Sequence, residues 1–407
     1  MRPDHLPSRG PLAGLLALAL AAPLSAQTPA GPSAQTEDGV HESARHDFRV
    51  VTVADGFDHP WSIAWLPGGE MLVTERSGRL RIVRDGRLDP EPVAGVPRVW
   101  ARGQGGLLDV LPHPDFARNG LVYLSFSKPS ADDSLATTAV VRGRLDGKRL
   151  ADVTEIFEAK AWSGAGAHFA GRMAFDREGY LFISVGDRGA APNLMADHPA
   201  QHLDNHQGTI IRLHDDGRVP SDNPFVGRSD ALPEIWSWGH RNPQGLAFDP
   251  RTGELWSDEH GPRGGDELNV IVRGRNYGWP VVSYGINYDG TLYTSETRRE
   301  GIEAPRWTWV PSIATSGLMV YTGERFPWWQ GSVFVGGLAG AQLARVSFAG
   351  ERAVSVEELL PGALGRIRDV RQGPDGLIYL AIDDRSGQTM TSVVRLEPVE
   401  GRVASPR

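Results

Sequence analysis

The chain has 407 residues, 40% of them hydrophobic, which is enough apolar material to bury a large core. Its formal net charge of −8 and its lack of any Lys/Arg block argue against nucleic acid or an anionic membrane surface as a partner. It contains no cysteine, which excludes disulfides, thiol catalysis and cysteine-bound metals, so core packing and chain closure must hold the fold.

The N-terminal segment predicts export. Two arginines precede an apolar run over residues 12–24, and the run ends in the small residues that suit signal peptidase. We therefore assign residues 1–26 to a signal peptide and residues 27–45 to a flexible polar leader. The apolar run is too short to cross a bilayer and no later run is long enough, so we expect no integral membrane segment and a periplasmic or secreted protein.

Six segments then repeat one pattern: an alternating apolar stretch, a turn with glycine and usually Asp, Asn or Pro, and a second apolar stretch. This pattern is typical of a β-hairpin. Its recurrence at irregular intervals indicates blades of four strands with loops of variable length, so we predict an all-β, six-bladed β-propeller over residues 46–398 and a tail over 399–407. Stacked β-sandwiches are the alternative, but they do not require one hairpin to recur. The six segments are residues 62–75, 108–127, 172–187, 244–261, 316–337 and 367–383.

The two ends of the predicted propeller suggest how the ring closes. Residues 46–57 alternate in the manner of a strand, and so do residues 391–398. We expect these two segments to pair, because such a closure would replace the missing disulfides.

Polar side chains recur just ahead of, or at the start of, several of these hairpins. Loops at one end of a propeller converge on the axis, so these side chains can share one site. Singly, each has a structural explanation; a histidine among glycines and alanines, for example, is often a turn residue. Together they bring three guanidiniums to one axis, which is costly unless a ligand with several carboxylates or phosphates neutralises them. The residues are Gln104, His168, Arg241, Asn242, Arg366 and Arg368.

A second polar cluster spans residues 258–279. It mixes four carboxylates with glycines that allow carbonyl groups to turn inward, a donor set that suits calcium better than zinc; a solvated acidic loop is an equal alternative on spacing alone. Elsewhere His198, His202 and His206 stand four residues apart, the spacing of metal ligands on a helix. Pro199 argues against a helix, so we predict a polar loop there.

The motifs carry a resemblance to a known family. "GQGGLLDV", "HFAGRMAF", "SVGDRG", "GHRNPQGLAFDP", "EHGPRGGDELN", "NYGWP", "YGINYDG" and "GRIRDV" occur in that order. The chain resembles the soluble, pyrroloquinoline-quinone (PQQ)-dependent aldose sugar dehydrogenases, relatives of soluble glucose dehydrogenase, from about His59 to Leu396. The resemblance implies a six-bladed propeller that binds PQQ and calcium and oxidises aldoses at C1 to lactones, passing electrons to an external acceptor.

The resemblance also implies roles for matching residues. His168 would be the general base that takes the proton of the anomeric hydroxyl while hydride moves to the quinone, and Asp187 would orient His168 and stabilise its cation. Arg241 and Asn242 would bind the quinone oxygens, with Arg241 stabilising negative charge on the reduced ring. The remaining implied ligands are Gln104, Arg366 and Arg368 for PQQ, and Glu267 and Tyr277, the latter through its carbonyl group, for calcium.

Two positions depart from the family pattern. Ala167 stands where soluble glucose dehydrogenase has an Asp before its base, which leaves the preferred sugar open. Ala339 stands where some relatives carry a lysine on the cofactor, which puts cofactor affinity in question.

Two other functions fit a propeller of this composition. One is a calcium-dependent hydrolase of sugar lactones, and the other is a ligand-binding propeller without catalysis. A lactonase has no use for three guanidiniums at the axis, whereas a tricarboxylate quinone does, so the arginines favour the dehydrogenase.

Overall fold

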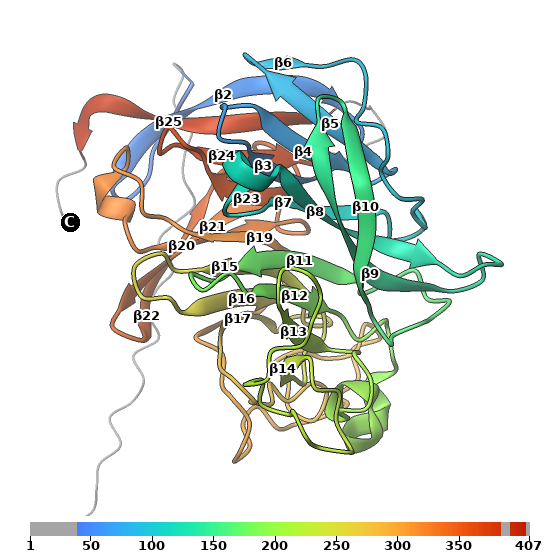
Figure 1. Cartoon of the computed structure of the whole chain (residues 1–407). Coiled ribbons are helices and arrows are strands. Elements are labelled where there is room, and N and C mark those ends of the chain that lie inside the picture. The colour runs from blue at the N-terminus through green and yellow to red at the C-terminus, as the bar shows by residue number, and fades with distance from the viewer. Residues whose placement is uncertain (1–38, 384–390, 404–407) are drawn as a thin grey trace, which may run out of the picture.

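The computed structural model describes residues 39–383 and 391–403. The predicted signal peptide, most of the predicted leader and residues 404–407 lie outside this part of the chain. Within it, six antiparallel sheets form a ring, so the predicted six-bladed β-propeller is confirmed (Figure 1). The helical segments of the described chain are short: α1 (Phe116–Asn119), η1 (Pro192–Asp197), η2 (Pro199–Gln201) and η3 (Pro327–Trp329). None of these helices is long and apolar enough to cross a membrane.

Each blade is a sheet whose first strand lies nearest the axis. Blade one contains β3 (Pro60–Trp65), β4 (Met71–Glu75), β5 (Arg79–Arg84) and β6 (Arg87–Leu88). Blade two contains β7 (Leu107–Pro112), β8 (Leu121–Pro129), β9 (Ala136–Asp146) and β10 (Arg149–Glu158). Blade three contains β11 (Ala170–Phe175), β12 (Leu181–Val185), β13 (Thr209–Leu213) and β14 (Ile235–Trp238).

The second half of the ring repeats the arrangement. Blade four contains β15 (Pro243–Phe248), β16 (Leu255–Glu259), β17 (Asp266–Ile271) and β18 (Trp307–Trp309). Blade five contains β19 (Thr315–Val320), β20 (Val333–Gly337), β21 (Gln342–Ala349) and β22 (Arg352–Leu359). Blade six contains β23 (Ile367–Gln372), β24 (Ile378–Ile382), β25 (Thr391–Val403) and β2 (His46–Phe57), with β1 (Val40–His41) at its outer edge.

All six predicted hairpins form, and each supplies the two inner strands of one blade. Their alternating residues are buried on both faces, because each sheet packs between its two neighbours. In blade two the turn also holds α1, which ends at Gly120 with a left-handed φ of 66°.

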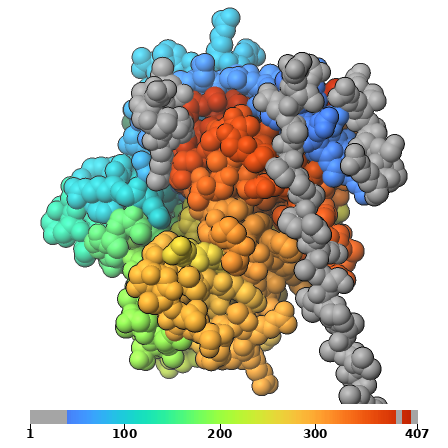
Figure 2. All heavy atoms as spheres, turned by 180° about the vertical axis from the view of Figure 1, so that it is seen from behind, coloured from blue at the N-terminus to red at the C-terminus, as the bar shows by residue number. Residues whose placement is uncertain are grey.

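The ring closes where the sequence predicted. β2 pairs antiparallel with β25 in blade six, with Val50 opposite Leu396, so a strand from the start of the chain completes a sheet begun near its end. Blue and red residues accordingly lie side by side in Figures 1 and 2. The ordered sheet also extends past the expected boundaries, because β1 pairs with β2 inside the segment assigned to the leader, and β25 continues to Val403.

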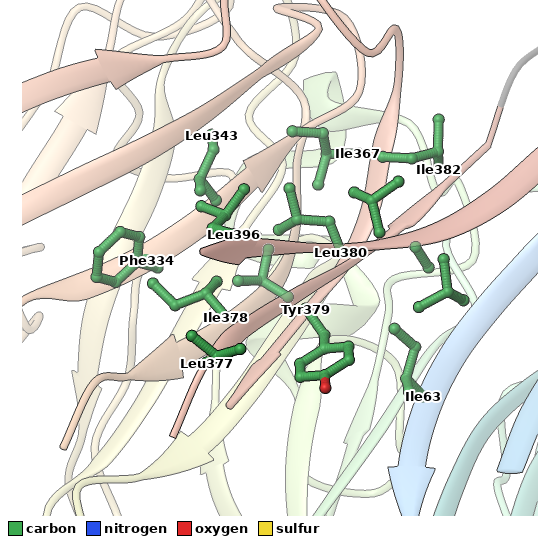
Figure 3. Packing of buried hydrophobic residues seen from close by; sticks show 14 of the residues in the cluster. Ile63, Phe334, Leu343, Ile367, Leu377, Ile378, Tyr379, Leu380, Ile382 and Leu396 are labelled. Atoms are coloured by element: carbon green, nitrogen blue, oxygen red, sulfur yellow. The ribbon is translucent and has the colours of Figure 1, made fainter. Parts of the chain in front are cut away.

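A large part of the core lies between blades five, six and one. Phe334 and Leu343 of blade five pack with Leu380 and Leu396 of blade six, and Ile63 contributes from blade one (Figure 3). Each of these side chains is at most 1% exposed. Since full burial of such a side chain contributes roughly 1.5–3 kcal/mol, this cluster joins the first and last blades through packing as well as through strand pairing.

Candidate active site

The first strand of every blade carries a register shift close to its start. The shifts lie in β3, β7, β11, β15, β19 and β23. A bulge adds a residue to one strand and re-aims its side chain, and bulges are common beside functional sites. Four residues inside these bulges, Trp61, Leu108, Gln244 and Arg368, line one cavity of about 210 Å³. All six blades contribute to its wall, so the cavity lies at the axis, and it is called the central cavity below.

His168 stands at the edge of this cavity, immediately before Phe169 and Ala170, which line it. Its Nδ1 lies 2.5 Å from Oδ1 of Asp187. A carboxylate only accepts hydrogen bonds, so Nδ1 carries the proton and donates it, and Nε2 is left as the acceptor. The His168 side chain is 13% exposed, whereas that of Asp187 is 1% exposed.

The backbone around His168 is held in an unusual conformation. His168 has a left-handed φ of 51°, which costs free energy for a residue with a Cβ atom. Two neighbours hold it there. Gln104 Oε1 accepts a hydrogen bond from the His168 backbone N–H at 2.8 Å, and the buried Arg188 donates to the carbonyl groups of Ala165 and Ala167. The Arg188 guanidinium also lies 3.5 Å from the Phe169 ring centroid.

Asp187 is fully hydrogen-bonded although it is buried. Its Oδ2 accepts from the indole N–H of Trp279 at 2.8 Å, and its Oδ1 also accepts from the backbone N–H of Gly189 at 2.8 Å. Burial by itself raises the pKa of Asp187, but the charge and hydrogen bond of His168 and the charge of Arg241 outweigh it, and the pKa lies below its ordinary value. Asp187 is therefore ionised at neutral pH.

Arg241 and Asn242 meet the central cavity through His260. Arg241 Nη1 donates to the carbonyl groups of His260 and Gly261 at 3.2 and 2.7 Å, and the Nδ2 of Asn242 lies 3.3 Å from His260 Nδ1. His260 lines the central cavity and donates through Nε2 to the carbonyl of Thr315 at 2.6 Å. Burial first, and then Arg241, lowers the pKa of His260 to about 3, so this imidazole stays neutral. Arg241 itself lines a smaller neighbouring cavity.

Arg366 and Arg368 both line the central cavity, as predicted. Arg368 Nη1 donates to Gln244 Oε1 at 3.1 Å, and Arg366 Nη1 donates to the carbonyl of Leu338 at 3.2 Å. Their common neighbour is Asp383, whose Oδ2 lies 3.8 Å from Arg366 Nε and 4.0 Å from Arg368 Nη2. Among the described residues, one carboxylate thus faces two guanidiniums at this side of the cavity.

Asp383 also holds a second histidine. His59 Nδ1 lies 2.6 Å from Asp383 Oδ1, and His59, like His168, has a φ of 51°. Ala339, where some relatives carry a lysine, is exposed and directly follows Leu338 of the cavity wall. A longer side chain at position 339 would therefore stand beside the cavity.

The predicted calcium ligands line the smaller cavity, which measures about 10 Å³. Glu267 on β17 is directly opposite Glu259 on β16, and both line this cavity together with Tyr277. Like charges opposite one another on paired strands are destabilising. Burial first, and then Glu259, raises the pKa of Glu267 well above its ordinary value. Among the described residues, no group of three or more His, Asp or Glu side chains is placed to hold a metal ion.

The three spaced histidines lie in irregular chain, as predicted. Pro199–Gln201 forms the short turn η2, so the histidines do not align on one helical face. His202 is exposed, whereas His206 is buried with its Nε2 2.9 Å from Glu234 Oε1. His198 is buried too, and its Nε2 lies 3.7 Å from Asp187 Oδ2, which places it beside the candidate base.

Four residues of the site were not predicted. His260 and Gln244 stand inside motifs already recognised. Gln244 is the second residue of the inner strand β15, so the position rule that selected its neighbours could have found it. Trp279 stands in the motif "NYGWP" and Asp383 ends the sixth hairpin segment, but their contacts could not be predicted, because their partners Asp187 and His59 are 92 and 324 residues away in the chain.

Comparison with known proteins shows the family of the chain. The family profile described as "Glucose / Sorbosone dehydrogenase" matches residues 57–392. The aldose sugar dehydrogenase YliI of Escherichia coli is 44% identical over 84% of this chain and 91% of its own. The apo-form structure of the soluble aldose sugar dehydrogenase from Escherichia coli superposes with a TM-score of 0.81 at 41% identity, over 86% of this chain and 100% of that one. The PQQ-bound aldose sugar dehydrogenase from Streptomyces coelicolor superposes with a TM-score of 0.71 at 29% identity, over 86% of this chain and 98% of that one. The chain therefore belongs to the glucose and sorbosone dehydrogenase family.

Proposed function

We propose that this protein is a PQQ-dependent oxidoreductase that oxidises aldose sugars at C1 to lactones. One observation carries the proposal: His168, with Nδ1 bonded to a buried carboxylate, stands at the edge of a cavity whose wall contains two arginines. A candidate base and a candidate anion-binding site thus lie beside the same central cavity. Relatives named as aldose sugar dehydrogenases, one of them PQQ-bound, support the same reaction.

The residues fit a planar tricarboxylate. Arg366 and Arg368 supply positive charge, and the aromatic rings of Trp61 and Phe169 supply flat apolar walls. Arg241 Nε is buried and has no hydrogen-bond partner among the described residues, so it can donate to a ligand oxygen. When bound, PQQ supplies the acceptor for the hydride that leaves C1 of the sugar. We assign Gln104, Arg366 and Arg368 to holding PQQ, and Arg241 and Asn242 to its quinone oxygens.

His168 is the proposed general base. Its Nε2 accepts the proton of the anomeric hydroxyl, because Nδ1 is occupied by Asp187. Asp187 keeps the ring in this tautomer and stabilises the imidazolium once the proton has moved, as a buried carboxylate does in other His-Asp pairs. Arg241 would place a fixed positive charge beside the quinone oxygens of bound PQQ, where negative charge would collect on reduction. Ala167, beside the base, removes one polar contact to the sugar, so we propose that several aldoses are accepted.

The smaller cavity is the proposed calcium site. Glu259 and Glu267 are opposite one another there, and Arg241 is the one lysine or arginine among the residues that line this cavity. A bound cation would relieve the repulsion between the two carboxylates. Glu267 and the carbonyl of Tyr277 would be ligands. Prolonged chelation should lower the melting temperature and the activity, and calcium should restore both better than magnesium. An unchanged melting temperature in a chelated, metal-free sample would remove calcium from the proposal.

We also propose that the protein is exported, on the strength of its N-terminal arginines and short apolar run, and that an external acceptor takes the electrons. The lactonase and the non-catalytic propeller predict a different result from the dehydrogenase in one assay. Protein free of cofactor is mixed with PQQ and calcium, and dye reduction is followed after addition of an aldose. A dehydrogenase reduces the dye; lactone hydrolysis without dye reduction, or neither activity, would overturn the proposed function.

A further inference from the structure

A third cavity, of about 450 Å³, lies on the outer part of blade five. Its wall comes from β21, β22 and η3, from the turn after β15, and from the residue before β2 (Figure 1). It shares no lining residue with the central cavity. Three arginines line it, and none of its lining residues is Asp or Glu, although the whole chain carries a net charge of −8. We call it the blade-five cavity.

One wall of this cavity is built from buried, ordered polar groups. Arg345 is 4% exposed and donates through Nε and Nη2 to Glu357 Oε2 at 2.9 and 2.6 Å. Its third nitrogen, Nη1, donates to Ser347 Oγ at 2.7 Å and Ser332 Oγ at 3.2 Å. Both serine hydroxyls thereby accept from the arginine, and their oxygens lie 3.4 Å apart, so one hydroxyl can donate to the other and the second keeps its hydrogen for a ligand.

The other two arginines keep donors for an anion. Arg251 binds Asp249 through Nε at 3.1 Å and Nη2 at 2.8 Å, which leaves Nη1. A Cβ atom at position 331 would lie 2.4 Å from that Nη1, so Gly331 makes the space that the guanidinium occupies. Arg45 is exposed, and its guanidinium has no hydrogen bond or ion pair within residues 39–383 and 391–403.

An aromatic ring completes the cavity. Trp328 is 60% exposed, in contrast to its neighbour Trp329, which is fully buried. Its backbone is held in place, because Trp328 belongs to η3 and its N–H donates to His46 Nε2 at 3.0 Å. An exposed indole offers a flat apolar face, and the apolar C–H face of a sugar ring is a suitable partner for it.

We propose that the blade-five cavity binds a carboxylated saccharide, with the carboxylate on Arg45 and Arg251, a sugar ring on Trp328, and hydroxyl groups on the serines. Arg45 can match a carboxylate in a bidentate manner, and Arg251 adds a donor through Nη1. The serines and Gln330 match neutral hydroxyls, so the cavity suits a ligand with both groups. This inference goes beyond the proposed oxidation, because the site is separate from the central cavity and requires neither PQQ nor calcium.

The test uses the chain free of cofactor and follows binding by calorimetry and Trp fluorescence. The probe is trigalacturonate, and its fully methyl-esterified form is the neutral control. We expect the acid to bind at least about tenfold more tightly than the ester, since a charge-assisted hydrogen bond has that effect, and the preference should shrink as salt rises. Arg45→Gln should abolish the preference for the acid, and Trp328→Ala should weaken the binding of both acid and ester. Arg118→Gln is the control: Arg118 lies on α1 with its side chain 78% exposed, and its substitution should change neither affinity.

Three results would overturn the inference: no binding of the acid, equal binding of acid and ester, or wild-type affinity in both Arg45→Gln and Trp328→Ala. Melting curves of the variants check that each is folded. Because the assay contains no PQQ, its outcome is independent of whether the protein oxidises sugars.

Discussion

Two histidines of this propeller are built alike and placed in different surroundings. His168 and His59 both have a φ of 51°, both precede the first strand of a blade, and each donates through Nδ1 to a buried carboxylate. For His168 that carboxylate is Asp187, at 2.5 Å; for His59 it is Asp383, at 2.6 Å. The pair of residues is therefore not by itself a sign of catalysis.

The neighbours of the two carboxylates make the difference. The second oxygen of Asp187 accepts from the neutral indole of Trp279, whereas Asp383 lies within 4.0 Å of the guanidiniums of Arg366 and Arg368. Asp187 feels the charge of Arg241 but hydrogen-bonds one histidine, His168, whereas Asp383 hydrogen-bonds His59 and lies within 4.0 Å of two guanidiniums. We propose that the same local arrangement serves proton transfer at His168 and positions the two arginines at His59.

The largest expected effect separates the two histidines directly. His168→Gln should lower dye-reducing turnover by about 10²–10⁴-fold with PQQ affinity nearly unchanged, since general-base catalysis contributes that much. His59→Gln is the matched control and should keep the rate of the chemical step, as measured at saturating PQQ. Near-normal turnover in His168→Gln, or an equal loss in His59→Gln, would contradict the assignment.

The arginine side should respond in binding rather than in chemistry. Arg368→Gln should weaken PQQ binding by roughly 10- to 100-fold, because a charge-assisted hydrogen bond contributes about 1.5–3 kcal/mol. Arg371→Gln is a control on the same strand, since Arg371 pairs with Asp109 and Asp369 and does not line the cavity. It should lower the melting temperature without changing PQQ affinity. Titration of the cofactor-free chain with PQQ measures the affinity of each variant, and melting curves measure their stability. Equal PQQ affinities in the two variants would exclude Arg368 as a ligand.

Adding a positive charge on the arginine side of the central cavity should strengthen PQQ binding. Ala339→Lys should tighten PQQ binding by about tenfold, because the exposed position follows Leu338 at the cavity wall, and the gain should shrink as ionic strength rises. Ala339→Gln serves as the uncharged control. If titration at two salt concentrations finds no gain in Ala339→Lys, residue 339 does not face the cofactor.

The smallest expected effect concerns stability and pH. Burial raises the pKa of Asp383, but Arg368, His59 and Arg366 outweigh it and the pKa lies below its ordinary value. A carboxyl whose pKa is lowered by folding stabilises the fold above its unfolded pKa of about 3.9, and this stability is lost as pH falls through the folded value. Asp383→Asn should therefore lower the free energy of unfolding by about 1–2 kcal/mol at pH 7, and by less below about pH 4. Urea unfolding of the cofactor-free chain at both pH values measures the difference in free energy of unfolding between wild type and Asp383→Asn. If this difference grows toward acid pH, ionised Asp383 does not stabilise the fold.

Local patterns were enough to predict the architecture. Alternation of apolar residues around a glycine turn depends only on neighbours in the chain, so all six hairpins and the pairing of β2 with β25 could be predicted. The same holds for Gln104, Arg366 and Arg368, because residues at equivalent points of repeated units must come together when the units close into a ring.

Tertiary structure decided which atoms meet within that ring. The bulges that place Gln244 and Arg368 in the cavity wall leave no mark in the alternation, since a strand with one extra residue still alternates on either side of it. Asp383 and His59 lie on different blades, and the arginines of the blade-five cavity come from three segments around residues 45, 251 and 345, so no spacing along the chain relates them. Hydrogen bonding and burial depend on distances in space, and those distances exist only once the ring has closed.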